Sequence, residues 1–246
     1  MGDSLADLTF CGLSDVGLHR ATNQDSYYIS PSGDIFIVAD GMGGHVGGKE
    51  ASRLATGVIQ RYLKTYWHSE CSSAELLERA IVQANQAVLK DQSEHPERSD
   101  MGTTVVLLMV RQGQFWCAHV GDSRLYRLRE SGFSQMTQDH TWVAQAMKTG
   151  ELTLDQLHHH PWRHVLSQCI GREELAEVAV QLISIEPGDR LLLCSDGLTE
   201  ELSEDAIITY LQSALTCEGA VAALIEAAKA QGGRDNITAI AISISA

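Results

Sequence analysis

The chain is poor in basic residues: 18 lysines and arginines stand against 32 aspartates and glutamates, which gives a formal net charge of -14 over 246 residues. This balance argues against a protein that binds the backbone of a nucleic acid, because such proteins need a basic surface. No apolar run approaches membrane-spanning length, and the first residues lack the basic and apolar regions of a signal peptide. We therefore expect a soluble, cytoplasmic protein with no nucleic-acid or membrane partner.

The sequence also lacks paired cysteines, internal repeats and low-complexity linkers. Its six cysteines are scattered without any C-x-x-C pair, and Cys117 and Cys194 lie inside apolar runs, where cysteine behaves as a small hydrophobic residue. This spacing indicates a reducing compartment and no disulfide framework. Because no change of composition divides the chain, we expect a single domain over residues 1–246. No conspicuous apolar stripe demands a partner, so we expect a monomer.

Short β-rich segments separated by tight turns predict strands over 8–12, 27–30, 35–39, 103–110, 115–120, 124–129, 177–183, 190–194 and 237–244. Helical periodicity predicts a first helix pair over 51–66 and 72–88 and a second pair over 207–214 and 220–227. The helix at 72–88 starts with a capping box, Ser72-x-x-Glu75. Each helix has one apolar face. The pattern predicts an α+β fold, a four-layer αββα sandwich of two antiparallel sheets flanked by helix pairs.

Five aspartates lie at the ends of predicted strands: Asp25, Asp40, Asp122, Asp196 and Asp235. For any one of them, an ordinary turn is the simplest interpretation. Five in one chain suggest a shared site, where neighbouring carboxylates would repel one another and become protonated unless cations neutralised them. Ligand sets made of oxygen alone favour Mg²⁺ or Mn²⁺ over zinc.

The segment VADGMGGHVGGKEAS at residues 38–52 offers another interpretation, a loop that cradles a nucleotide phosphate. A dinucleotide fingerprint starting at Gly41 needs glycine or alanine where the chain has Val46. A Walker loop starting at Gly43 needs serine or threonine where the chain has Glu50. Each alternative therefore fails at one residue.

A larger set of motifs resembles a known family. The segments SDVGLHRATNQDS, VADGMGGH, MGTT, AHVGDSRLY, LLLCSDGL and GGRDNIT occur in the order of the type 2C (PPM) metal-dependent protein serine/threonine phosphatases, and they cover nearly the whole chain. The resemblance is strongest to the single-domain bacterial members, especially the cyanobacterial ones. It implies an αββα sandwich with a metal cleft at one edge of the two sheets. It also makes the phosphorylated PII signalling protein, the substrate of a cyanobacterial member, a candidate substrate here.

The resemblance further implies a role for each acidic residue. Asp40 would bridge two Mn²⁺ or Mg²⁺ ions, the Gly41 carbonyl would bind the second ion, and Asp196 and Asp235 would complete the shell of the first. Asp25 would act through a water on the metal. Two close ions can bridge a water, lower its pKa and direct it at phosphorus.

Three further positions match the pattern around these ligands. Asp122 would hold a third metal together with Asp196, and Asn236 would support Asp235. Gln24 stands where many relatives have glutamate, so one charge of the outer shell is missing. Without a phosphoenzyme, no nucleophilic cysteine is expected.

Arg20 and His45 are the candidates for contact with the substrate. Arg20 matches the family arginine that binds the substrate phosphate through a bidentate fork. Some eukaryotic relatives have a histidine where this chain has Met42, and His45 is the nearest substitute. His45 could protonate the leaving seryl oxygen, position a water or cap the next helix.

Residues 137–172 match the flap beside the active site of bacterial members. Asp139, His140, Thr141 and Arg172 are its candidate substrate contacts. The histidines at 158–160 and 164 resemble a transition-metal cluster, but consecutive histidines point in different directions, so we expect solvated or packed side chains. The alternative function is a catalytically weak module that binds phosphoproteins, and the intact ligand set argues against it.

Overall fold

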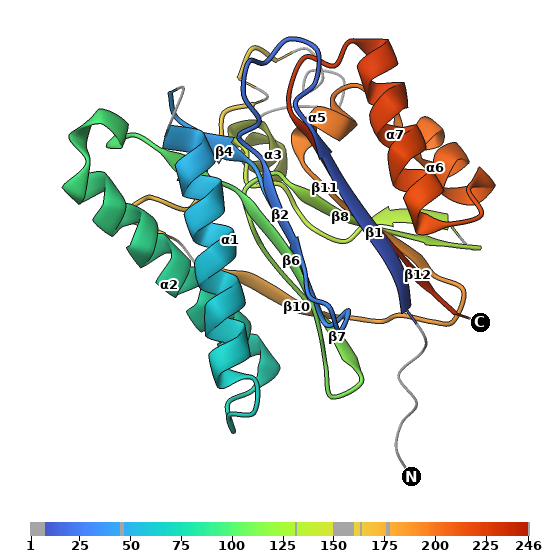
Figure 1. Ribbon diagram of the computed structural model, residues 1–246, viewed down its shortest axis with the longest axis horizontal. Helices are drawn as coiled ribbons and strands as arrows, with labels where there is room; N and C mark the ends of the chain where they lie inside the picture. Colours follow the sequence, from blue (N-terminus) through green and yellow to red (C-terminus); the bar gives the residue numbers. More distant parts are fainter. Residues whose placement is uncertain are drawn as a thin grey trace.

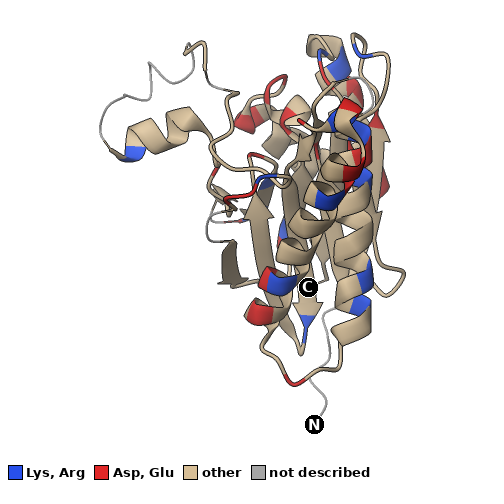
Figure 2. Cartoon of the chain, turned by 90° about the vertical axis from the view of Figure 1, so that its left-hand side faces the viewer, with Lys and Arg blue, Asp and Glu red and all other residues tan. Residues whose placement is uncertain are grey.

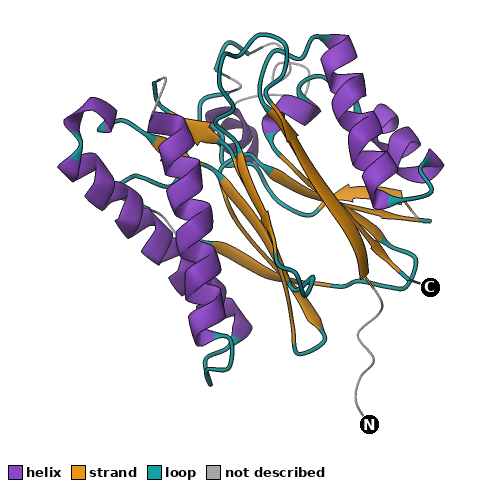
Figure 3. Ribbon diagram, in the orientation of Figure 1, coloured by secondary structure: helices purple, strands orange, loops and turns teal. Residues whose placement is uncertain are grey.

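The computed structural model describes residues 8–44, 47–130, 132–149, 160–162, 164–175 and 178–245. Within these residues two antiparallel sheets lie face to face, and a helix pair covers the outer face of each (Figure 1). Figure 3 shows the same four layers by type of structure, with helices outside and strands inside. The predicted αββα sandwich is confirmed.

The first sheet has the order β1 (Leu8–Asp15), β12 (Ile237–Ile244), β11 (Arg190–Cys194), β8 (Arg124–Arg129) and β9 (Gly132–Gln135). The second has the order β10 (Ala179–Ile183), β7 (Gln114–Val120), β6 (Val105–Arg111), β3 (Ile35–Ala39) and β2 (Ser26–Ile29). A short pair, β4 (Gly41–Met42) and β5 (Gly102–Thr103), lies beside the second sheet.

The helices are α1 (Gly47–Tyr66), α2 (Ser73–Glu94), α3 (Trp142–Lys148), α5 (Asp196–Thr199), α6 (Glu204–Ser213) and α7 (Cys217–Gln231), with a 3₁₀ turn η1 (Pro96–Arg98). The first pair, α1 and α2, packs on the second sheet, and α6 and α7 pack on the first. The Ser72 hydroxyl caps α2 by accepting a hydrogen bond from the Glu75 N–H, as the capping box predicts. None of the helices in the described part of the chain has the length and apolar character needed to cross a bilayer.

Strands β3 and β12 are apolar on both faces because both faces are covered. In β3, Phe36 and Val38 pack against the facing sheet, whereas Ile35, Ile37 and Ala39 pack against α1 and α2. The same alternation runs along β12, where alanines at 239 and 241 face the helices and isoleucines at 240 and 242 face the other sheet. Most charged side chains lie on helices and loops, and the strands are mostly tan in Figure 2, although β8 carries arginines at 124, 127 and 129.

Register places the predicted aspartates at one edge of the sandwich. Cys194 at the end of β11 pairs with Ala239 near the start of β12, and Ala39 at the end of β3 pairs with Ser26 at the start of β2. Val120 at the end of β7 pairs with Val105 at the start of β6. Since antiparallel neighbours begin where their partners end, the aspartates that flank these strands meet at the same edge.

Candidate active site

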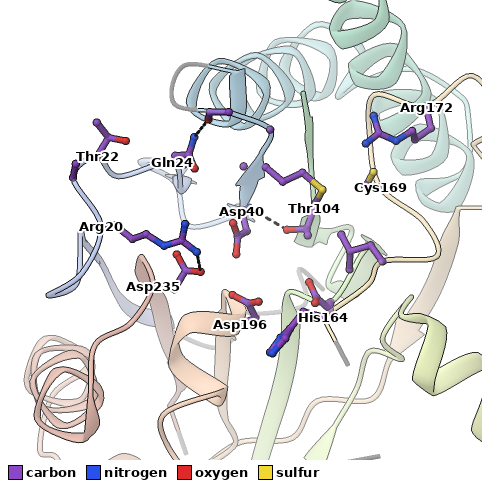
Figure 4. Close-up of a pocket in the computed structure, with 17 residues that line it drawn as sticks. Arg20, Thr22, Gln24, Asp40, Thr104, His164, Cys169, Arg172, Asp196 and Asp235 are labelled. Carbon is purple, nitrogen blue, oxygen red and sulfur yellow. Dashed lines mark hydrogen bonds and ion pairs between the residues drawn. The ribbon is translucent and has the colours of Figure 1, made fainter. Parts of the chain in front are cut away.

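A cleft of about 550 Å³ opens at this edge. It is lined by six of the residues expected to bind metal or phosphate, namely Arg20, Asp40, Gly41, Asp122, Asp196 and Asp235. Figure 4 shows the carboxyl groups of Asp40, Asp196 and Asp235 converging from three segments of the chain. Asp25 and Asn236 are buried close by. His45 lies outside the described residues.

Asp40 is held at the end of β3 by the two threonines of the MGTT motif. Its N–H donates to the Thr104 hydroxyl (3.0 Å), while the Asp40 carbonyl accepts from the Thr104 N–H (2.9 Å) and from the Thr103 hydroxyl (2.8 Å). Thr104 in turn shares a hydrogen bond with Ser123, the residue that follows Asp122 (2.7 Å). These contacts fix the Asp40 and Asp122 backbones relative to each other.

Gly41 is a point of close backbone contact with the start of α1. A Cβ at Gly41 would lie 2.0 Å from the Gly48 carbonyl oxygen and 2.6 Å from that of Gln24. A Cβ at Gly48 would lie 2.7 Å from the Gly41 carbonyl oxygen. The glycines therefore let the helix start pack directly on the residue whose carbonyl is a candidate ligand.

Asp25 lies beneath the cleft between two hydroxyl donors. Its Oδ2 accepts hydrogen bonds from Ser195 (2.8 Å) and Thr238 (2.6 Å). Its Oδ1 is buried and has no hydrogen-bond partner among the described residues. Burial raises the pKa of Asp25 to about 7, the two hydroxyls oppose this shift, and the charges of Asp196 and Asp235 add to it.

The other carboxyl groups of the cleft behave in the same way. Burial, followed by repulsion from Asp25 and Asp196, raises the pKa of Asp40 well above its ordinary value. Burial and the Asp196 charge raise the pKa of Asp122 well above the ordinary value too. Burial is also the main cause of the raised pKa of Asp196, whose Oδ1 is buried without a hydrogen-bond partner in the described part of the protein.

These features fit a centre for hard divalent cations. Carboxylates that burial and mutual repulsion drive toward protonation become stable as anions when cations lie between them. Oxygen atoms buried without hydrogen-bond donors are the ligands that Mn²⁺ and Mg²⁺ use. The residues present therefore fit two such ions, and Asp122 beside Asp196 extends the oxygen set toward a third.

Asn236 and Arg20 shape the rim around Asp235. The Asn236 side chain donates to the carbonyls of Val16 (2.9 Å) and Thr22 (3.1 Å), and its Oδ1 accepts from the Gln24 N–H (2.8 Å). This clamp holds the loop that carries Arg20. The Arg20 guanidinium, whose side chain is 51% exposed, donates to Asp235 Oδ2 (2.6 Å).

Gln24 contacts the glycine loop. Its side-chain amide donates to the carbonyl oxygen of Gly44 (2.8 Å). A glutamate, which many relatives have at this position, would lack this N–H donor. The hydrogen bond to Gly44 therefore gives a structural reason for glutamine here.

The 137–172 segment borders the cleft through residues near its end, with Arg172 lining it and donating to the Met101 and Gly171 carbonyls. The other three candidate substrate contacts in this segment stabilise the fold instead. Asp139 forms a bidentate ion pair with Arg124, His140 accepts from the Gly121 N–H (3.2 Å), and Thr141 caps α3. His160 packs on Trp142 (ring centroids 5.0 Å apart), as expected for a packed histidine, whereas His164 lines the cleft. His158 and His159 lie outside the described residues.

Sequence reasoning assigned no role to Thr104, Ser195 and Thr238, which hold Asp40 and Asp25 in place. Ser195 directly precedes Asp196, and Thr238 follows Asn236 at the spacing that puts alternate strand residues on one face. Ser195 beside Asp196 was the available signal, whereas Thr104 and Thr238 contact aspartates that are distant in the sequence.

Comparisons with known proteins agree with this geometry. The family model described as protein phosphatase 2C matches residues 19–231. The serine/threonine protein phosphatase PstP of Mycobacterium tuberculosis is 32% identical over 240 residues, which cover 96% of this chain and 45% of that protein. The chain thus spans about half the length of PstP. The serine/threonine phosphatase stp of Listeria monocytogenes is 34% identical, with 93% of each chain covered.

A solved structure extends the similarity to three dimensions. The crystal structure of the catalytic domain of PstP in complex with two manganese ions superposes with a TM-score of 0.85 at 30% identity, covering 97% of this chain and 99% of that one. Family model, sequence relatives and fold agree over nearly the whole length, and the chain belongs to the protein phosphatase 2C family.

Proposed function

We propose that the chain is a metal-dependent protein phosphatase that hydrolyses phosphoserine and phosphothreonine on proteins. The observation that carries this proposal is the convergence of Asp40, Asp122 and Asp196 in one cleft, each with a raised pKa, above the buried Asp25. The names of the relatives as serine/threonine phosphatases support the reaction class.

The residues that would hold the cations are Asp40, the Gly41 carbonyl, Asp196 and Asp235, with Asp122 and Asp196 for a third ion. Bound Mn²⁺ or Mg²⁺ supplies Lewis acidity and an activated water for attack on phosphorus. Asp25 lies beneath these ligands, and the hydroxyls of Ser195 and Thr238 fix its orientation. Asn236 holds the loop that leads to them.

Arg20 is proposed to bind the substrate phosphate. A guanidinium carries five N–H donors in a planar fork, so Arg20 can keep its contact with Asp235 and still bind a phosphate oxygen. A phosphate bound in this way would lie beside the carboxylate cluster. His45 is proposed to protonate the leaving seryl oxygen or to position a water at the glycine loop.

The protein part of the substrate is proposed to contact the 137–172 segment, the flap of a single catalytic domain that comprises residues 1–246. Arg172 lines the cleft on the side away from Arg20 (Figure 4) and is its candidate contact. The resemblance to cyanobacterial members supports a PII-like signalling protein as substrate. Free cysteines throughout support a cytoplasmic setting, and we propose a monomer there.

Phosphate release from a phosphoserine peptide and from p-nitrophenyl phosphate, with and without Mn²⁺, tests the proposal. We expect turnover only with Mn²⁺, and a loss of at least about a hundredfold in Asp40→Asn, the cost of removing a single electrostatic stabiliser in an active site. Asp205→Asn, which neutralises an exposed aspartate of α6, is the matched control and should keep wild-type activity.

Two outcomes would contradict the proposal. Turnover that needs no metal ion, or an active Asp40→Asn variant, would exclude the carboxylate centre as the site of catalysis. A wild-type protein that binds the phosphopeptide in Mn²⁺ without hydrolysing it would support the regulatory module. Incubation with phosphorylated PII and with unrelated phosphoproteins then tests the proposed substrate.

A further inference from the structure

His164, Asp196 and Glu200 form a cluster at the mouth of the cleft. One ligand atom from each side chain lies within 4.8 Å of the others, and His164 Nδ1 contacts Glu200 Oε1 directly. Figure 4 shows the His164 ring next to the Asp196 carboxyl group. His164 and Glu200 are accessible from solvent, with 43% and 34% of their side chains exposed.

Local structure holds the three side chains together. The Glu200 N–H donates to the Asp196 carbonyl (2.8 Å), so the two carboxylates lie one helical turn apart, at the first residue of α5 and at its C-cap. His164 lies in a turn closed by the Val165 N–H and the Trp162 carbonyl (3.0 Å). The Trp142 N–H and a bridge between Thr141 and Leu166 tie that turn to the start of α3.

The cluster differs in chemistry from the centre proposed for catalysis. One imidazole nitrogen with two carboxylates suits a transition metal such as Zn²⁺, whereas Mg²⁺ favours oxygen ligands alone. Ligand atoms at about 2.0–2.2 Å from one Zn²⁺ lie about 3.5 Å apart. Small rotations of the accessible His164 and Glu200 side chains would bring the three atoms from their present spread to that spacing.

A second observation points to a cation at this place. Asp196 Oδ1 is buried and has no hydrogen-bond partner among the described residues, although the carboxyl group lies at a cleft that water can enter. The ion pair between His164 and Glu200 does not include that oxygen atom. The catalytic cations proposed above would satisfy it, and so would a metal ion bound by His164, Asp196 and Glu200, so the two kinds of ion compete for Asp196.

We propose that His164, Asp196 and Glu200 bind a single transition-metal ion of the Zn²⁺ class at the mouth of the cleft. Asp196 is also a proposed ligand of the catalytic cations. The expected effect of Zn²⁺ on catalysis therefore rests on the proposed function, whereas Zn²⁺ binding does not. An ion at this site withdraws Asp196 from the catalytic centre and fastens the turn at His164 to α5. We therefore expect Zn²⁺ to inhibit by competing with the catalytic cations for Asp196, with His164 and Glu200 as ligands that those cations do not use.

Calorimetric titration of the full chain with Zn²⁺, in saturating Mg²⁺, tests binding. We expect one Zn²⁺ ion per chain, and an affinity at least about tenfold weaker in Glu200→Gln and in His164→Gln, since even residues that only support a metal ligand contribute 10–100-fold. Glu204→Gln and His68→Gln, which alter exposed residues of the same types elsewhere, should match wild type. Zn²⁺ should also shift the ring resonances of His164, identified by their loss in His164→Gln.

Binding that is equal in wild type, Glu200→Gln and His164→Gln would overturn the site, as would unshifted His164 resonances. Inhibition is tested separately on Mn²⁺-dependent turnover: Glu200→Gln should raise the half-inhibiting Zn²⁺ concentration at least about tenfold. An unchanged value would place inhibition at the catalytic carboxylates and overturn the consequence. Absence of Mn²⁺-dependent turnover would contradict the proposed function alone, because Zn²⁺ binding is measured without it.

Discussion

Asn236 is the residue on which the loop around Arg20 depends. It is 4% exposed, and its side chain donates to two carbonyls of residues 16–22 and accepts from the backbone of Gln24. One amide thus replaces the hydrogen bonds that a regular strand would have supplied to this loop. The loop positions Arg20 on one side and Asp25 on the other.

Replacing Asn236 with aspartate keeps the shape and removes both donors. The new carboxylate would face the Val16 and Thr22 carbonyls, so we expect the free energy of unfolding to fall by about 2–4 kcal/mol. Urea unfolding measures this. Gln231→Glu, which makes the same chemical change at an exposed position of α7, should leave stability within about 0.5 kcal/mol of wild type. A similarly small change for Asn236→Asp would show that the clamp is dispensable.

At this scale, the sequence predicted the acidic residues better than their supports. One aspartate next to glycine at a strand end is an ordinary turn, but the recurrence of this pattern in one chain is uncommon. The positions of Asp40 and Asp196 could therefore be inferred. The contact between Thr238 and Asp25 joins residues 213 positions apart. Hydroxyl residues are common, and only the pairing of distant strands decides which of them meets a carboxylate.

The glycine loop shows how packing decides where an element begins. Helix periodicity placed the start of the first helix at residue 51, whereas α1 begins at Gly47. Glycine weakens a helix, so its presence indicated a loop. Here Gly48 lies in the first turn because only a residue without a side chain lets α1 approach the Gly41 carbonyl.

Two glycine-to-alanine changes in α1 separate these effects. Gly48→Ala puts a Cβ 2.7 Å from a backbone oxygen, so the helix start must shift, and we expect a loss of about 1–3 kcal/mol in unfolding free energy together with reduced turnover. A Cβ at Gly57 would lie 3.2 Å from the flexible end of Arg61, so Gly57→Ala should gain up to about 1 kcal/mol. Chemical unfolding and the phosphatase assay measure both. Equal stabilisation by the two changes would refute the packing role of Gly48.

Other elements followed their local patterns to different degrees. The bounds of β3, β8, β11 and β12 are those predicted, because alternating or continuous apolar runs end at clear turn residues. The β4–β5 pair was missed, since two-residue strands carry no periodicity and form only through long-range pairing. Strand β9 and helix α3 were missed as well, in segments where turn and helix signals mix.

The four-layer architecture could be predicted because it depends on which faces are apolar. Helices with one apolar face and strands with two require helices outside and sheets inside. The order of strands could not be predicted in the same way. The pairing of β1 with β12 brings the two ends of the sequence together, and no local feature of either strand encodes its partner.

For the whole molecule, the carboxylate cluster should link metal binding, pH and stability. The pKa of Asp25 is about 7 in the metal-free fold against an ordinary value of 3.8, and those of Asp40 and Asp122 lie well above the ordinary value too. Between the two values the folded state binds more protons than the unfolded state, so the free energy of unfolding falls as pH rises. The half-buried His140, with a pKa lowered to about 4, has the opposite effect below pH 6.5, where unfolding adds a proton to it.

The effect of the carboxylates on stability is therefore best measured between pH 6.5 and 8, where His140 does not oppose it. Over this window we expect the Tm of the metal-free protein to fall, by about 2–4 °C for each kcal/mol of stability lost in a chain of this size. Mn²⁺ should remove the fall and raise Tm at both pH values, because the cations balance the carboxylate charge and bind only the folded state. Thermal unfolding in EDTA and in Mn²⁺ measures both effects. The control Asp205→Asn should keep the pH dependence of Tm, whereas Asp40→Asn should weaken it. A metal-free protein whose Tm is constant or rises from pH 6.5 to 8 would mean that the cleft carboxylates do not oppose folding, and that cations are not needed to hold them together.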